Sequence, residues 1–246
     1  MKTARFVSTL VAAGMALAPA APLAAQASDQ RPTVAIMYFN NASFGKDAKD
    51  YESLGRGIGD LMITDLSSNP GIRVVDRDAI DKLMKEQDLG NTQRVDQETA
   101  ARIGKLLGAR YMVFGSLIVD PKGTVTLNAR AVDVETSRIA YVESVNGKSD
   151  AMMDVIRQLT DKMNKGMKLP DLPRRTAMVP TPGSSQQVAQ APLPQKVPFA
   201  AVMLYSKALK ASSEGRKDEA VTLFRKCVTD FPEFDKPKEE LRKIGA

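Results

Sequence analysis

The chain has 246 residues, of which 43% are hydrophobic and 26% are charged, and it carries a formal net charge of +6 at pH 7. It contains no histidine and a single cysteine, Cys227. Zinc sites built from His and Cys and an intrachain disulfide are therefore excluded, and the commonest general base of enzymes is missing.

The positive charge lies mainly outside the part expected to form the main domain. Residues 28–167 hold 19 Lys and Arg against 20 Asp and Glu, whereas residues 1–27, 168–198 and 199–246 carry net charges of +2, +3 and +2. Nucleic-acid binding needs basic side chains clustered on a folded surface. We therefore expect no nucleic-acid partner.

Residues 1–27 have the three zones of a cleavable secretory signal peptide. Two basic residues precede an apolar stretch at 6–17, and an Ala-rich segment then ends at Ala25-Gln26-Ala27, a small-x-small cleavage site. The apolar stretch is shorter than the roughly 20 residues of a membrane-spanning helix. The sequence predicts cleavage after Ala27, a periplasmic mature protein with peripheral attachment to the outer membrane left open, and no transmembrane segment after cleavage.

Hydrophobic periodicity within residues 28–167 alternates between that of strands and that of helices. The apolar run at 33–39 predicts a strand buried on both faces. The other predicted elements are a helix at 51–67, a strand at 72–76, a helix around 80–84, a helix from 96 to Gly108, strands at 111–119, 124–134 and 138–145, and a helix at 150–167. This order predicts an α/β (α+β) domain with a mixed β-sheet and flanking helices.

One predicted strand, 124–134, has a clear division between its two faces. Its apolar side chains alternate with Thr126, Asn128 and Arg130. Such alternation is typical of a strand with one buried and one hydrated face. We therefore expect these three polar side chains to lie on an open face of the sheet.

The remaining sequence predicts a linker and a helical tail. Residues 168–198 hold seven of the fourteen prolines, a composition that buries too little apolar surface to remain ordered, so a disordered linker is predicted. Residues 199–246 predict a helical hairpin with a final helix. The spacing of Ala220, Phe224, Cys227 and Pro232 after Gly215 resembles a tetratricopeptide (TPR) repeat, in which Cys227 would be a small buried residue. Whether this tail packs on its own domain or on a partner is left open.

Two motifs suggest ligand chemistry and are better explained by structure. The hexapeptide 55–60, Gly-Arg-Gly-Ile-Gly-Asp, partly matches a dinucleotide-binding fingerprint, but Asp60 occupies the sixth position and the preceding strand ends about fifteen residues earlier. Its glycines are interpreted as flexibility at the start of a helix. Asp76, Asp78 and Asp81 cluster near another helix start, where helix capping is favoured over a metal site.

A third motif, Asn41-Ala42-Ser43, matches a glycosylation acceptor, but the motif is short enough to arise by chance. The sequence therefore predicts no catalytic, cofactor-binding or metal-binding residue, and no enzymatic activity.

Four stretches, at 33–41, 74–77, 108–116 and 130–136, resemble the CsgG family, the curli production assembly and transport components. The resemblance extends over residues 31–167, and the same layout is similar to the N-terminal domain of TolB-like periplasmic proteins. It implies a CsgG/TolB-N-terminal-like fold and partners among envelope or secretion proteins, with self-association left open.

The sequence departs from the channel-forming members of that family. Those members are lipoproteins with long membrane hairpins, whereas this chain has no cysteine at the predicted cleavage site. The corresponding turns, at 120–123 and 146–149, are also shorter than the roughly 9–11 residues of a membrane strand.

The leading hypothesis is a non-catalytic, soluble periplasmic assembly or scaffold factor that binds envelope or secretion proteins. A subunit of an outer-membrane curli-type secretion channel is the alternative. A carboxylate-dependent periplasmic enzyme, with its site near Asp76, is the second alternative.

Overall fold

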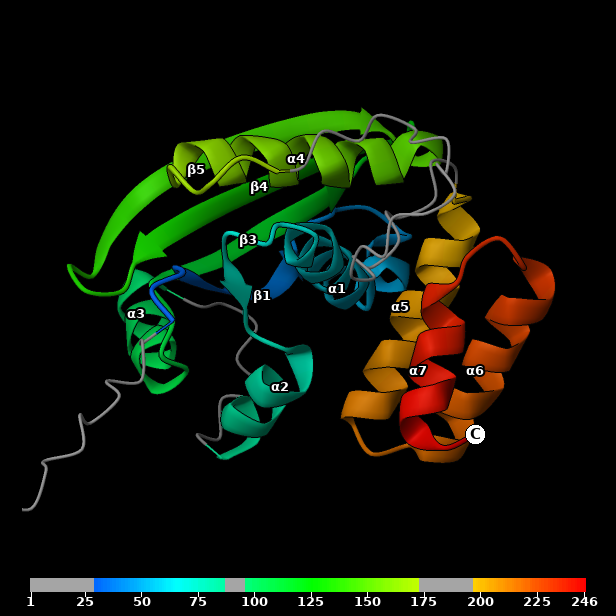
Figure 1. The fold of residues 1–246 in the computed structure, drawn as a ribbon. Coiled ribbons are helices and arrows are strands. Elements are labelled where there is room, and N and C mark those ends of the chain that lie inside the picture. The colour runs from blue at the N-terminus through cyan, green and yellow to red at the C-terminus, as the bar shows by residue number, and fades with distance from the viewer. Residues whose placement is uncertain (1–28, 87–95, 173–196) are drawn as a thin grey trace, which may run out of the picture. The chain divides into compact units, whose positions relative to one another are not determined.

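A mixed five-stranded sheet, in the order β2-β1-β3-β4-β5, lies at the centre of the fold (Figure 1). Its strands are β1 (Thr33–Asn41), β2 (Arg73–Val74), β3 (Tyr111–Val119), β4 (Thr124–Asp133) and β5 (Arg138–Lys148). β1 pairs in parallel with β2 and β3, whereas β3, β4 and β5 are antiparallel neighbours. The predicted mixed sheet with flanking helices is confirmed, and β5 forms one of its edges.

The computed structural model describes residues 29–86, 96–172 and 197–246, and residues 31–246 form one compact unit. The predicted signal peptide and residues 173–196 of the predicted linker lie outside the described residues. The helices are η1 (Ala48–Tyr51), α1 (Leu54–Ser67), α2 (Arg77–Glu86), α3 (Gln97–Leu106), η2 (Ser149–Ala151), α4 (Met152–Gly166), α5 (Phe199–Ser213), α6 (Lys217–Asp230) and α7 (Lys236–Ile244). No helix in these ranges is long and apolar enough to cross a membrane.

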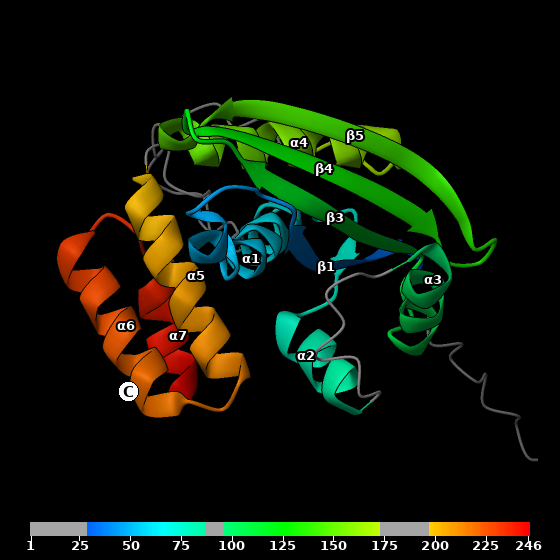
Figure 2. The same cartoon turned by 180° about the vertical axis from the view of Figure 1, so that it is seen from behind.

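The two faces of the sheet bury separate hydrophobic cores, because neighbouring residues of a strand point to opposite faces. Val113 of β3 and Leu127 of β4 pack with α1, α4 and α5 in the larger core. Met112, Phe114 and Val132 pack with α2 and α3 in the smaller one. Figure 2 shows α4 lying along β4 and β5, and α5, α6 and α7 lying together beside α1.

Glycines let α1 approach its neighbours closely. A Cβ atom on Gly55 would lie 1.7 Å from the carbonyl oxygen of Phe39 in β1, and one on Gly57 would lie 1.9 Å from Oγ of Ser206 in α5. Both distances are shorter than any normal contact, so a side chain at either position would force its neighbour to move. These glycines lie in the first turn of α1, at the helix start that the sequence predicted, and they allow close packing on both sides.

The helical tail packs on its own domain, which answers the question left open by the sequence. α5 contacts α1 directly, and α6 packs on α5 and α7. Tyr205 of α5 meets the rings of Phe224 and Phe234, with centroids 5.9 and 5.2 Å away. Cys227 is fully buried, as expected of a small core residue. The TPR character of the tail stays a prediction.

Some predicted boundaries change. The strand predicted to end at Val145 continues to Lys148, because residues 146–148 still pair with β4. The predicted linker is attached to the domain at both ends, where Leu169 and Val197 are buried in the larger core. The Pro170 carbonyl also accepts hydrogen bonds from Asn69 and Asn164.

Candidate functional site

A groove of about 1150 Å³ lies between the sheet and α5, the first helix of the tail. Its floor is a part of the sheet face whose other part is covered by α2 and α3, and its walls are η1, the beginning of α1 and the end of α5. The CsgG-like domain and the tail thus both contribute to it. The residues lining its floor and walls from the strands, η1, α1 and α5 include Asn40, Lys49, Glu52, Arg56, Phe114, Ser116, Asn128, Arg130, Val142, Ser144, Lys210 and Glu214.

A row of polar side chains crosses the floor from β1 to β5. The strand register places Asn40 opposite Ser116, Ser116 opposite Asn128, and Asn128 opposite Ser144. Residues directly opposite each other share one face of the sheet. Within the described residues none of these four side chains makes a hydrogen bond, so their amide and hydroxyl groups are free to bind a ligand.

The next row of the floor combines a charge with apolar groups. Phe114, Arg130 and Val142 are opposite one another on β3, β4 and β5. Arg130 is exposed and has no ion-pair partner among the described residues, and Val142 is 55% exposed. Thr126, Asn128 and Arg130 alternate with buried residues along β4, so the expected division between its two faces is confirmed.

The carboxylates lining the groove are already paired with cations. Glu52 lies 3.4 Å from Lys210, whereas the side chain of Glu143 points to the opposite face of the sheet, where it lies 3.1 Å from Lys162 of α4. Glu214 pairs with Arg216. Hydrogen bonds from Tyr141 and then Lys162 lower the pKa of Glu143. These carboxylates therefore leave the positive charge of Arg130 uncompensated.

Arg56 forms part of the groove wall and is held by two neighbours. Its guanidinium lies 4.2 Å from the ring centroid of Tyr38, a cation–π contact, and 3.5 Å from the carboxylate of Asp81. The Tyr38 hydroxyl also donates to Asp81. Burial, followed by the charge of Asp81, raises the pKa of Tyr38 well above its ordinary value. Tyr38 therefore stays protonated and acts as a donor.

The three clustered aspartates have separate positions. Asp76 accepts a hydrogen bond from the backbone N–H of Asp78 at 2.9 Å, just before α2 begins, which is the geometry of a helix cap. Asp81 lies one turn later and is turned toward Arg56 and Tyr38. Within the described ranges no three His, Cys, Asp or Glu side chains are grouped as a metal site requires.

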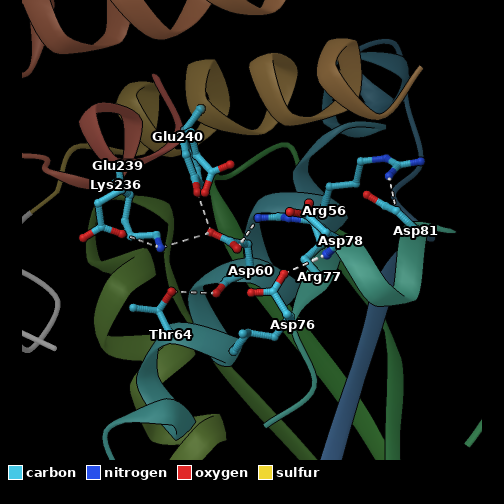
Figure 3. A network of polar contacts seen from close by, with 12 residues as sticks. Arg56, Asp60, Thr64, Asp76, Arg77, Asp78, Asp81, Lys236, Glu239 and Glu240 are labelled. Atoms are coloured by element: carbon cyan, nitrogen blue, oxygen red, sulfur yellow. Dashed lines mark hydrogen bonds and ion pairs between the residues drawn. The ribbon is translucent and has the colours of Figure 1, made fainter. Parts of the chain in front are cut away.

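A buried polar cluster connects the tail to the domain. It consists of Asp60 on α1, Arg77 on α2 and Lys236 on α7, which are labelled in Figure 3, together with Tyr205 on α5, and we call it the Asp60 cluster. Asp60 pairs with Arg77, accepts a hydrogen bond from the Tyr205 hydroxyl, and lies 4.0 Å from Nζ of Lys236. All four residues are buried.

Burial and charge act against each other in this cluster. Burial by itself lowers the pKa of Arg77, but the Asp60 carboxylate, with smaller contributions from other groups, raises it overall. Burial and then Asp60 raise the pKa of Tyr205. Arg77 is therefore a cation, and Tyr205 is a neutral donor to Asp60. The sequence analysis missed this cluster, whose partners are distant in the chain; the one available signal was a charged residue inside the apolar run of α1.

Comparison with protein families gives one match. The model of the family described as "Curli production assembly/transport component CsgG" matches residues 20–119, a segment that includes β1, β2 and β3. The resemblance to the CsgG family is confirmed. No curated protein matches.

Several solved structures are similar to part of the chain. The C-terminal domain of LpoB from Escherichia coli has 17% identity and a TM-score of 0.36, with 51% of this chain and 89% of that chain covered. Lipoprotein GNA1162 from Neisseria meningitidis has 15% identity and a TM-score of 0.39, with 47% and 79% covered. TolB from Acinetobacter baumannii has 18% identity and a TM-score of 0.35, with 57% and 28% covered.

Proposed function

Taking the CsgG-family match of residues 20–119 as the premise, we propose that this chain is a non-catalytic periplasmic protein that binds other envelope proteins and supports their assembly. The family description concerns curli production, assembly and transport. The predicted signal peptide would direct the chain out of the cytoplasm, where envelope proteins are assembled. Within this protein-binding function, we propose that the chain acts as an assembly or scaffold factor.

The groove is the observation that carries the proposal. It has about 1150 Å³ of space, slightly above the 300–1,000 Å³ of typical small-molecule pockets, and it is open along the sheet. Its polar row and exposed Val142 resemble a surface for a chain segment more than an enclosed pocket. Its walls come from both the domain and the tail, so binding there depends on the docked tail.

The chemistry of the groove supports a binding role over catalysis. An acid–base mechanism needs a titratable group close to the reacting atoms and with a suitable pKa. Glu52 and Glu214 are each paired with a cation, and the Glu143 carboxylate lies on the other face of the sheet beside Lys162. The chain also has no histidine to act as a base.

Site-specific crosslinking in intact cells tests the proposal. A photo-crosslinking residue is placed at Val142 in the groove of the full chain, and at Leu106, an equally exposed apolar residue on α3, as the matched control. We expect Val142 to give covalent adducts with envelope proteins, identified by mass spectrometry, in larger yield than Leu106. A third probe at Lys226 on the tail samples the surface away from the groove. Absence of envelope adducts from all three positions would overturn the proposal.

A further inference from the structure

We propose that the groove binds an extended acidic peptide segment of the partner protein, with a carboxylate of that segment on Arg130. The inference rests on the proposed protein-binding function and specifies the chemistry of the partner. It is drawn from three properties of the groove, which are its uncompensated charge, its row of polar side chains and its exposed apolar end.

The charge of the groove favours an anionic ligand. Among the described residues, neither Arg130 nor Lys49 has an ion-pair partner, and both line the groove. The carboxylates of Glu52 and Glu214 are paired with Lys210 and Arg216, and that of Glu143 lies on the other face of the sheet beside Lys162. The planar guanidinium of Arg130 can form two hydrogen bonds with an incoming carboxylate. No existing ion-pair partner among the described residues would have to be displaced.

The polar row fits the backbone of a peptide. Asn40, Ser116, Asn128 and Ser144 stand on four neighbouring strands, which are about 4.8 Å apart, so the row is about 14 Å long. An extended peptide advances about 3.3 Å per residue, and about four residues would cover the row. The amide and hydroxyl groups of the row can both donate to and accept from peptide N–H and C=O groups.

The β5 end of the groove offers an apolar contact. Val142 is 55% exposed, and Ile139, earlier on the same strand, is 43% exposed. Val142 is directly opposite Arg130 on the same face of the sheet, and in an extended peptide only every second side chain points toward that face. The preferred segment therefore has an acidic residue, which reaches Arg130, and an apolar residue two positions away, which rests on Val142.

A peptide suits the groove better than an acidic polysaccharide. Sugar rings pack well on exposed aromatic faces, but Phe39 and Phe114 are buried, and Arg56 covers the ring of Tyr38. The groove floor thus presents hydrogen-bonding groups and an aliphatic side chain instead of a stacking surface.

Peptide binding to the mature chain provides the test. Fluorescein-labelled hexapeptides that carry aspartate and valine in turn at every second position, with serine between them, are compared, by fluorescence anisotropy at low salt, with otherwise identical peptides that carry asparagine in place of aspartate. We expect the acidic peptides to bind about fivefold more tightly, the effect of one exposed charge pair. Arg130→Glu should remove this preference. The matched control is Arg138→Glu, the same charge change at an exposed position of β5 that does not line the groove, and it should keep the preference.

Several outcomes would reject the inference. Equal binding of the two peptides by the wild-type chain would do so, as would acidic-peptide binding by Arg130→Glu at the wild-type level. Binding of an acidic polysaccharide such as alginate without binding of the peptides would also reject it. Repeating the crosslinking from Val142 in the Arg130→Glu chain distinguishes the failure of this inference from the failure of the proposed function. If envelope adducts persist in that variant, the chain still binds envelope proteins, but the recognition of acidic segments by Arg130 is rejected.

Discussion

Tyr205, on α5 of the tail, donates a hydrogen bond to the buried carboxylate of Asp60, on α1 of the CsgG-like domain. The two residues are 145 positions apart in the chain. With Arg77 beside the same carboxylate, this contact connects the tail to both α1 and α2. The docked tail completes the groove, so the stability of this contact bears directly on binding.

Removing the Tyr205 hydroxyl should weaken the docked structure. In Tyr205→Phe the ring contacts with Phe224 and Phe234 remain, but Asp60 loses a buried donor. A hydrogen bond to a charged group contributes about 1.5–3 kcal/mol, and we expect a loss of that size in the free energy of unfolding measured with urea. Tyr51→Phe is the matched control, because Tyr51 contacts Phe199 but its hydroxyl makes no hydrogen bond within the described residues. Equal losses in the two variants would contradict the assigned role of the hydroxyl.

Removing the charge of Arg77 alone, the cation closest to Asp60, should be more costly than removing the charges of Arg77 and Asp60 together. Arg77→Met leaves the Asp60 carboxylate buried without its closest cation, and breaking a buried pair in this way costs about 3–5 kcal/mol. Asp60→Asn in the same chain removes the unpaired charge and keeps an acceptor for Tyr205. Urea unfolding should therefore show that Arg77→Met/Asp60→Asn is more stable than Arg77→Met alone. A double variant as unstable as the sum of the two single variants would show that the two charges do not act as a pair.

The close contact between α1 and α5 predicts a compensating pair of substitutions. In Gly57→Ala the new Cβ would lie 1.9 Å from Oγ of Ser206, so the hydroxyl must rotate away or the helices must separate, and overpacking of this kind costs about 1–3 kcal/mol. Ser206→Ala removes the clashing oxygen. The loss of stability from Gly57→Ala should therefore be smaller in the Ser206→Ala background than in the wild-type chain. The same loss in both backgrounds would mean that the strain arises elsewhere.

Local features of the sequence were sufficient to predict most elements of the sheet domain. The helix start at Asp96 was correct because its side chain accepts a hydrogen bond from the backbone N–H of Thr99, a cap that depends on residues three apart. The turn at 120–123 was correct for a similar reason, since Asp120 accepts from the N–H groups of Lys122 and Thr124. Interactions of this range can be predicted from residue types and spacing alone.

The candidate site depends on long-range pairing that residue spacing does not reveal. Alternation within β4 correctly placed Asn128 and Arg130 on an open face, but the polar row exists only because the register sets Ser116 and Ser144 on either side of Asn128. Likewise, Gly57 could not be recognised as a packing glycine, because the residue that needs the space, Ser206, lies in another helix far along the chain. The pattern within one strand thus predicts which of its side chains are exposed, but not which side chains of other strands lie beside them.

The reactivity of the buried Cys227 thiol should report whether the tail is closed or open. Burial, followed by the nearby charge of Asp230, raises the pKa of Cys227 from 9.0 to about 12, and Sγ donates to the carbonyl of Ala201 on α5 at 3.7 Å. Because the raised pKa keeps the thiol protonated below that value, almost no reactive thiolate exists in the closed tail at pH 7 to 9. Once the tail opens, the pKa returns toward its ordinary value and the thiolate fraction rises steeply over the same range.

Iodoacetamide labelling of Cys227, followed by mass spectrometry, should therefore be much slower in the native chain at pH 8 than in urea. Its rate should follow the opening of α5 from α6. Phe224→Ala leaves a cavity beside Tyr205 and should accelerate native labelling, whereas Leu106→Ala, which changes an exposed side chain on α3, should not. Native labelling as fast as that of the unfolded chain would show that the tail is open in solution. The groove, two of whose lining residues belong to α5 and the turn that follows it, would then lack one of its walls.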